Sequence, residues 1–293
     1  PWNYPLTLAI SDALPAILAG NTIVLKPASL TPFTALYAMK LLREAGLPYE
    51  VFQVVTGSGS QVGQPLIGNV DFLQFTGSTS TGRHVAQTAG ERLIGYSMEL
   101  GGKNPILVME DADVEKAVSG IIRGSFANTG QLCIAFERLY VHRSLYNRLV
   151  DWLVQSTHDL KLGAALDFSA DVGSLISQEQ LEKTREHVED ARSKGAAVLA
   201  GGRARPDLGP YFYEPTLLAG VTAEMAVFAE ETFGPVLSIY PFDREDEAVK
   251  MANDTQYGLN AAIWTRDSAR ARRLAQKIEA GTVNINEAYW AAW

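Results

Sequence analysis

Hydrophobic positions in the first hundred residues alternate between two spacings. Some segments carry apolar residues near helical spacing, and others are short β-branched or aromatic runs, as in strands joined by helices. The pattern predicts helices at 6–18 and 32–45 and strands at 22–25, 51–55 and 72–75. Pro32 after Thr31 marks the start of the second helix, and Gly46 marks its end. We therefore expect an α/β fold with a mostly parallel sheet and helices on its faces.

The pattern changes near the Glu-Leu-Gly-Gly segment at 99–102, where we place a domain boundary. Beyond it, helices are predicted at 114–129, 146–160, 178–194, 246–253 and 267–279, and strands at 106–109, 139–142, 236–240 and 282–285. Residues 201–210 are expected to form a surface loop. The chain is therefore expected to have two domains, 1–101 and 102–293, and the second is again α/β.

Composition places the chain among globular proteins and excludes several kinds of partner. Of its 293 residues, 47% are hydrophobic and 20% are charged, and the formal net charge is −8 without a basic run, so no nucleic acid partner is expected. No stretch approaches the ~18 apolar residues of a membrane helix, so we expect a soluble chain without a membrane partner and, by default, a cytoplasmic location. One cysteine and four histidines argue against a disulfide and a Cys-rich zinc site, and no metal is expected.

The single cysteine, Cys133, is the first candidate for chemistry. It follows Asn128–Gln131 in a predicted turn, where Gly130 should end the preceding helix, whereas a structural cysteine usually lies inside an apolar run. A thiol reacts as its thiolate, which needs help from nearby charges or dipoles. On position alone, an inert cysteine remains the more common case.

Three further candidates stand at predicted strand ends. Glu99 precedes two glycines and could act as a general base on water, although spacing alone favours a solvated glutamate. The loop 77–82 (Gly-Ser-Thr-Ser-Thr-Gly) opens a helix whose N-terminus suits a phosphate, but it is neither G-x-G-x-x-G nor a P-loop. Lys26 ends the first strand, near the loop Gly57-Ser58-Gly59. Because ligands gather at the carboxyl ends of parallel strands, these features together favour a binding site.

Seven segments, in order along nearly the whole chain, resemble the aldehyde dehydrogenase superfamily. They are residues 1–5 (Pro-Trp-Asn-Tyr-Pro), 26–28, 75–79, 99–103, 128–133, 231–235 and 253–259. The resemblance implies a partial Rossmann-type parallel cofactor sheet in 1–101 and an α/β catalytic domain in 102–293. It implies oxidation of a small-molecule aldehyde to a carboxylic acid with hydride transfer to NADP or NAD. For the full-length protein it implies a homodimer or homotetramer.

The resemblance also implies roles for individual residues. Cys133 would be the nucleophile that forms a thiohemiacetal and then a thioester, and its backbone N–H would form an oxyanion hole with the Asn3 side chain. Glu99 would activate the water that hydrolyses the thioester. The cofactor would contact Trp2, Lys26, Ser29, Gly57, Gly59, Gly77, Ser78, Glu231 and Phe233. Of these, Lys26 would bind the adenosine ribose, Ser78 the pyrophosphate and Glu231 the nicotinamide ribose.

Departures from the family pattern bear on cofactor and substrate. Ser29 stands where NAD-preferring members carry a glutamate, which predicts that NADP is accepted and preferred. The amino-acid sequences of segments 26–29, 130–134 and 281–287 are similar to those of bacterial succinate-semialdehyde dehydrogenases. This similarity favours succinate semialdehyde as the substrate. Better-known members of that group hold the substrate carboxylate with arginines, where this chain has Ser11 and Ala127. Arg138 is expected to have a structural role, and Arg123 also falls outside those positions.

Alternatives remain open on the sequence alone. They are a general aliphatic or aromatic aldehyde dehydrogenase, a CoA-acylating relative, which Glu99 disfavours, and an inactive remnant that only binds nucleotide. Members of the family ordinarily have further residues before the position of residue 1 and after that of residue 293, so we expect this chain to be a piece of a longer one. If the chain exists alone, we expect exposed sheet edges, self-association and weak or no activity.

Overall fold

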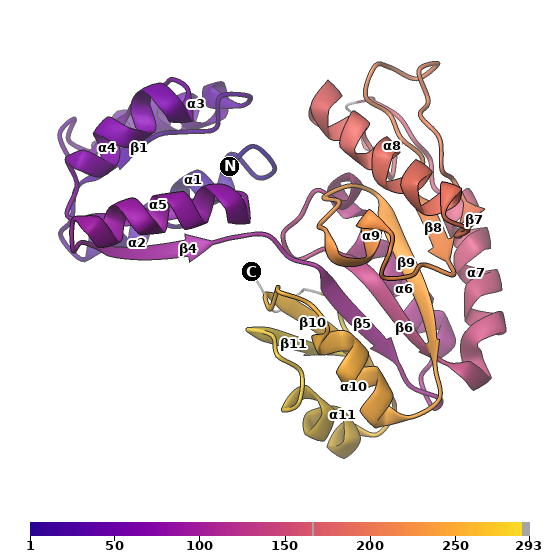
Figure 1. Ribbon diagram of the computed structural model, residues 1–293. Helices are drawn as coiled ribbons and strands as arrows, with labels where there is room; N and C mark the ends of the chain where they lie inside the picture. Colours follow the sequence, from indigo (N-terminus) through magenta and orange to yellow (C-terminus); the bar gives the residue numbers. More distant parts are fainter. Residues whose placement is uncertain (166, 289–293) are drawn as a thin grey trace. The chain divides into compact units, whose positions relative to one another are not determined.

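The computed structural model describes residues 1–165 and 167–288. The chain divides into two compact units, Pro1–Leu100 and Gly101–Trp293 (Figure 1). Both combine helices with parallel strands, so the expected α/β class is confirmed.

The first unit contains two separate pairs of parallel strands. Strand β1 pairs with β2, and β3 pairs with β4, each in parallel register. A small core of Ala13, Met39 and Phe52 lies beneath the first pair. In chain order the elements are α1 (Thr7–Ile10), α2 (Ala13–Leu18), β1 (Ile23–Leu25), α3 (Pro32–Glu44), β2 (Phe52–Val54), the π-helical turn η1 (Gly59–Gly63), α4 (Gln64–Gly68), β3 (Phe72–Thr76), α5 (Thr79–Glu91) and β4 (Gly95–Glu99).

The expected single helix over 6–18 is wrong, because the structure has two short helices separated at Ser11 and Asp12. Pro15 explains the break. It has no backbone N–H to donate to the carbonyl of Ser11, and in a continuous helix its ring would clash there. In the first turn of α2 neither problem arises.

The second unit is built on a seven-stranded sheet. Its strand order is β11-β10-β5-β6-β9-β8-β7, and every pair is parallel except β7 with β8. In chain order the elements are β5 (Asn104–Val108), α6 (Val114–Phe126), η2 (Ala127–Gly130), β6 (Phe136–His142), η3 (Arg143–Leu145), α7 (Tyr146–His158), α8 (Gln178–Ser193), β7 (Ala197–Ala200), β8 (Thr216–Ala219), α9 (Ala226–Ala229), β9 (Val236–Phe242), α10 (Glu245–Asn253), β10 (Asn260–Trp264), α11 (Ser268–Ala275) and β11 (Thr282–Ile285).

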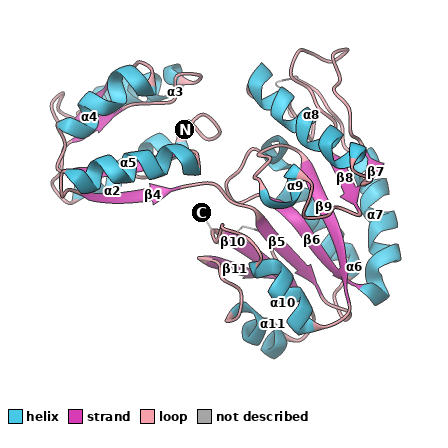
Figure 2. Cartoon of the chain, viewed as in Figure 1, coloured by secondary structure: helices cyan, strands magenta, loops and turns pink. Residues whose placement is uncertain are grey.

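Helices cover both faces of this sheet (Figure 2). Alternate residues of β5 enter opposite clusters: Leu107 packs with residues of α8, α10 and α11, and Ile106 packs with residues of α6 and α7. All five residues of β5 are buried, as in a strand covered on both faces. Among the strands that the sequence pattern did not predict is β10. Its Asn-Ala-Ala-Ile-Trp sequence has one β-branched residue, and tertiary burial imposes the strand.

Four neighbouring parallel strands, β10, β5, β6 and β9, have their amino ends at one edge of the sheet. The segments that lead into these strands are therefore brought together. They are 258–259, 101–103, 131–135 and 231–235. Three of these segments contain residues that the sequence singled out, namely Gly101, Cys133 and Glu231.

Candidate active site

Three expected cofactor residues meet at the carboxyl end of β1 and β2 in the first unit. The Lys26 Nζ donates to the carbonyl oxygen of Gly57 at 3.1 Å, and the Ser29 Oγ donates to the same oxygen at 3.2 Å. Partial burial lowers the pKa of Lys26. The structure thus brings together Lys26 and the Gly57 loop, which the sequence placed on successive strands, and Ser29, which the family resemblance singled out. Gly59 begins the η1 turn, which Ser58 caps by accepting from the Gln61 N–H at 3.2 Å.

The second pair of strands in this unit positions Gly77, Ser78 and Glu99. The Gly77 N–H donates to the carbonyl of Glu99 at 3.0 Å, next to the parallel pair of Thr76 with Glu99. Ser78 is the N-cap of α5, and its side chain accepts from the Thr81 N–H at 3.3 Å. A helix N-terminus therefore begins where β3 and β4 end, and the exposed side chain of Glu99 stands on the last residue of β4.

The segment before Cys133 has an unusual backbone. Helix α6 ends at Phe126, short of the predicted 129, because Asn128, Thr129 and Gly130 all adopt left-handed angles, with φ of 50°, 59° and 69°. A non-glycine residue held in this region costs on the order of 1–3 kcal/mol, so the surroundings must fix it. A Cβ on Gly130 would lie 2.3 Å from the carbonyl oxygen of Gly234, so only glycine fits there.

Side chains hold this segment against residues 173–176. The Thr129 Oγ1 donates to the carbonyl of Gly173 at 3.1 Å. The Gln131 Oε1 accepts from the Ile176 N–H at 2.9 Å, while its Nε2 donates to the carbonyl of Asn128 at 3.1 Å. Cys133 follows in a half-buried turn just before β6. The turn expected at Cys133 is therefore present.

Gly101 and Gly102 bring the Cys133 and Glu231 segments together. The Gly102 N–H donates to the Glu231 Oε1 at 2.7 Å. A Cβ on Gly101 would lie 2.4 Å from the Glu231 Oε2, and a Cβ on Gly102 would lie 2.5 Å from the carbonyl oxygen of Cys133. Because neither glycine has a side chain, the Glu231 carboxylate can approach Gly101 closely, and the Cys133 carbonyl can approach Gly102 closely.

A buried ion pair supports the Glu231 segment. The Lys103 Nζ lies 2.5 Å from the Glu137 Oε2, and the two residues are 1% and 3% exposed. The Glu137 carboxylate also accepts from the N–H groups of Thr232, at 2.9 and 3.0 Å, and Phe233, at 2.8 Å. Phe233 has a left-handed φ of 56°, which these bonds help to hold. Burial lowers the pKa of Lys103, and Glu137 opposes that shift.

Helix α8 holds the other side of the same segment. The Gln180 Nε2 donates to the carbonyls of Thr232 and Phe233, both at 2.9 Å, and the His187 Nδ1 lies 3.1 Å from the Thr232 Oγ1. Gln180 and His187 lie two helical turns apart on one face of α8. Neither residue was predicted from the sequence. A signal was present, since Thr184 and His187 are polar residues in the buried stripe of α8.

Glu231 sits in an environment that disfavours its charge. Burial, and to a smaller extent the charge of Glu137, raise the pKa of its carboxyl to about 7, although the Gly102 N–H bond and the charge of Lys183 oppose the shift. At neutral pH this carboxyl is therefore close to half-ionised. It is the strongly perturbed acid next to the Cys133 peptide, which is typical of a functional site.

The arginines discussed for substrate binding have other partners. Arg138 is buried and donates to the carbonyls of Lys103 at 2.7 Å and Ala252 at 2.9 Å, so its role is structural, as expected. Arg123 on α6 forms an ion pair with Glu287. Within residues 1–165 and 167–288, no group of three or more His, Cys, Asp and Glu could hold a metal ion. In the same residues, no helix is long and apolar enough to cross a membrane.

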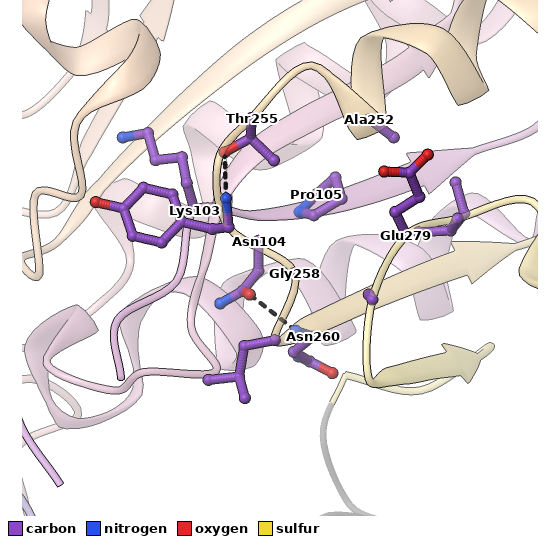
Figure 3. Close-up of a pocket in the computed structure, with 12 residues that line it drawn as sticks. Lys103, Asn104, Pro105, Ala252, Thr255, Gly258, Asn260 and Glu279 are labelled. Atoms are coloured by element: carbon purple, nitrogen blue, oxygen red, sulfur yellow. Dashed lines mark hydrogen bonds between the residues drawn. The ribbon is translucent and has the colours of Figure 1, made fainter. Parts of the chain in front are cut away.

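Two cavities of the second unit differ in what they can hold. The cavity in Figure 3, between the start of β5 and the loop 255–260, has a volume of about 10 Å³, enough for about one water molecule. A hollow of about 550 Å³ lies between α6 and α7 and is lined in part by Phe126, Ala127 and Trp152. Neither cavity is lined by Cys133 or Glu231.

Comparisons with known proteins agree with these features. Residues 1–292 match the model of the Aldehyde dehydrogenase family. A Mycobacterium tuberculosis protein, provisionally named a succinate-semialdehyde dehydrogenase [NADP(+)], is 52% identical over 293 residues, which is 100% of this chain and 57% of that protein. The Escherichia coli succinate-semialdehyde dehydrogenase [NADP(+)] GabD is 43% identical over 288 residues, covering 98% of this chain and 60% of GabD.

A solved structure supports the same relationship. The crystal structure of an E. coli NADP dependent enzyme is 42% identical and superposes with a TM-score of 0.95, over 98% of this chain and 60% of that one. The chain thus spans 57% to 60% of the length of these relatives. On the family match over 1–292 and these identities, the chain belongs to the aldehyde dehydrogenase family.

Proposed function

We propose that the whole protein containing this chain oxidises an aldehyde to a carboxylate, with NADP as the preferred hydride acceptor and NAD as the alternative. Family membership supports the reaction class. The observation that carries the proposal is the contact of Gly102 with both the Glu231 carboxylate and the Cys133 carbonyl. This contact brings the candidate nucleophile next to the residue proposed to hold the nicotinamide ribose.

In the proposed reaction, the Cys133 thiolate attacks the aldehyde carbonyl carbon, and a C–S bond forms while the carbonyl oxygen becomes an oxyanion. The Cys133 N–H and the Asn3 amide stabilise that oxyanion. A nicotinamide bound here would accept the hydride, so that the thiohemiacetal carbon loses its C–H bond, the oxyanion re-forms the C=O bond and a thioester remains on Cys133. Glu99 takes one proton from water as the water oxygen attacks the thioester carbon, the C–S bond breaks and restores the thiolate, and the carboxylic acid loses its remaining proton to solvent as it leaves.

The residues present fit a dinucleotide. The Glu231 carboxylate accepts one bond from Gly102 and has further lone pairs for ribose hydroxyls. Lys26 and Ser29 converge on the Gly57 carbonyl, which places donors for the adenosine ribose. The capped N-terminus of α5 at Ser78, after Gly77, suits a pyrophosphate. The other proposed contacts are Trp2, Gly59 and Phe233. We accordingly assign 1–101 to cofactor binding and 102–293 to catalysis.

Succinate semialdehyde is the proposed substrate, supported by the names of the M. tuberculosis and E. coli relatives. The test is NADPH formation by the whole protein with succinate semialdehyde and with neutral aliphatic and aromatic aldehydes. The highest kcat/KM is expected for succinate semialdehyde. A higher value for a neutral aldehyde would reject the substrate and keep the reaction class, whereas no oxidation of any aldehyde would reject both.

Replacing Ser29 with Glu is expected to shift cofactor preference toward NAD. The new carboxylate would repel the 2′-phosphate of NADP, and two like charges about 4 Å apart cost about 1–4 kcal/mol near a protein surface. The ratio of kcat/KM for NADP to that for NAD should therefore fall by about 10-fold or more. Ser29→Ala, which adds no charge, is the matched control and should change the ratio much less. A strong preference of the unaltered protein for NAD would contradict the prediction.

Cofactor binding is expected to weaken as the pH falls through about 7, where Glu231 takes up a proton. The ionised carboxylate above that pH accepts hydrogen bonds from hydroxyls, and a bond to a charged group contributes about 1.5–3 kcal/mol. The KM for the cofactor should therefore rise by about 10-fold between pH 8 and pH 6. Glu231→Gln removes the titration and should give a raised KM that is flat over this interval. The same inflection in that variant would assign the titration to another group.

A further inference from the structure

Asparagine side chains hold the carbonyl oxygens of three consecutive residues at the candidate nucleophile. The Asn104 Nδ2 donates to the carbonyl of Cys133 at 2.8 Å and to that of Ala135 at 2.7 Å. The Asn260 Nδ2 donates to the carbonyl between them, that of Ile134, at 3.0 Å. Asn104 and Asn260 are the first residues of β5 and β10, which are neighbours in the sheet.

The three asparagines are also linked to one another across three strands. The Asn104 Oδ1 accepts from the backbone N–H of Asn260 at 3.0 Å, as drawn in Figure 3. The Asn260 Oδ1 in turn accepts from the Asn284 Nδ2 on β11 at 2.8 Å. The Asn284 Nδ2 also donates to the carbonyl of Ala261 at 3.2 Å. We call Asn104, Asn260 and Asn284 the asparagine ladder.

The ladder is buried, since its members are 2%, 1% and 5% exposed. Burying an amide side chain is unfavourable unless it is hydrogen-bonded. Apolar side chains would fill this part of the sheet without that requirement, so three buried amides here call for an explanation. The loop that they bond, residues 133–135, comes just before β6, whose pairing with β5 begins at Phe136. Side chains therefore bond the three carbonyl oxygens at positions that precede the backbone pairing of β6 with β5.

We propose that Asn104, Asn260 and Asn284 are positioning residues for the oxidation proposed above, on which this inference rests. By fixing the peptide planes that follow Cys133, they set the direction of the Cys133 Sγ and of its N–H, the proposed oxyanion donor. Gly102 belongs to the same arrangement, because a Cβ at this position would lie 2.5 Å from the Cys133 carbonyl oxygen. A misplacement of a reacting group by about 1 Å costs about 10²-fold in rate.

The test compares kcat with cofactor KM in the whole protein. Asn104→Ala and Asn260→Ala each remove direct donors to the loop and are expected to lower kcat by about 10–100-fold, with the cofactor KM within about 2-fold. Asn284→Ala leaves both direct donors in place and should lower kcat by less, about 3–10-fold. This milder variant keeps the test available if the other two fail to fold.

Asn253→Ala is the matched control. Asn253 also makes two side-chain bonds to backbone, to the Lys277 carbonyl at 2.9 Å and from the Glu279 N–H at 3.0 Å, but none to the loop. It should lower Tm by a similar amount and leave kcat within about 2-fold.

Alkylation of Cys133 by iodoacetamide, followed by mass spectrometry of the peptide that contains it, supplies a second readout. A positioning role predicts alkylation rates within about 3-fold of the unaltered protein, since a small reagent needs no oxyanion geometry. Local unfolding would instead speed alkylation toward that of a free thiol. Three results would overturn the inference: kcat unchanged in the ladder variants, an equal loss in Asn253→Ala, or loss explained by cofactor KM. Absence of aldehyde oxidation by the unaltered protein would overturn the proposed function as well.

Discussion

Cys133→Ala is expected to lower kcat for aldehyde oxidation by roughly 10⁴–10⁶-fold, the range seen when a catalytic nucleophile is removed from other enzymes. The proposed reaction needs a covalent bond to sulfur, and Cys133 is the one cysteine among residues 1–293. NADPH formation by the whole protein is the measurement. The half-buried position of Cys133 in a turn predicts a change in Tm that is small by comparison. Activity that survives this substitution would refute the thioester mechanism.

Glu99→Gln separates the two halves of the same mechanism. Without a general base, the thioester on Cys133 should still form, but its hydrolysis should slow by about 10²–10⁴-fold. A burst of NADPH equal to one turnover is therefore expected, and mass spectrometry should find the acyl group on Cys133. In the Cys133→Ala variant neither the burst nor the adduct should appear. Fast steady-state turnover by Glu99→Gln would remove this residue from the mechanism.

Local patterns predicted most of the fold of the described residues, because apolar spacing and caps are local properties. The helix at Gln178–Ser193 and the strand at Thr282–Ile285 lie within a residue of the expected bounds. The exceptions have physical causes. Pro15 divides the first expected helix, and the left-handed residues Asn128 and Thr129 end α6 early. An alanine-rich segment becomes β10 only because the sheet surrounds it.

The candidate site was predictable where a motif is local, and not where it depends on distant pairs. Family motifs located Cys133 and Glu231, but Lys103 and Glu137 are separated by 34 positions and give no local signal. The rule that ligands gather at the carboxyl ends of parallel strands describes Lys26 and Ser78 in the first unit. In the second unit, the residues singled out by sequence lie instead at the amino ends of β5, β6 and β9.

Lys103→Met is expected to lower the free energy of unfolding by about 3–5 kcal/mol, because it leaves the buried Glu137 carboxylate without its cation. The substitution should also weaken cofactor binding. Without its cation, the Glu137 carboxylate is expected to move, which disturbs the bonds that it accepts from the Thr232 and Phe233 N–H groups. Denaturant unfolding measures the first effect, and cofactor KM the second.

The double variant Lys103→Met, Glu137→Gln distinguishes loss of a charge partner from loss of packing. It leaves no buried charge at this position, so it should recover part of the lost stability, and a cycle with the two single variants gives the coupling. Cofactor KM should also recover in part, because the Thr232 and Phe233 N–H groups both donate to the Glu137 Oε1, and an amide oxygen can still accept both bonds. Lys194→Met is the control in the same unit. Its pair with Asp190 is partly exposed, and the change should cost about 1 kcal/mol or less. An equal cost at Lys103 and Lys194 would mean that the buried pair does not support the Glu231 segment.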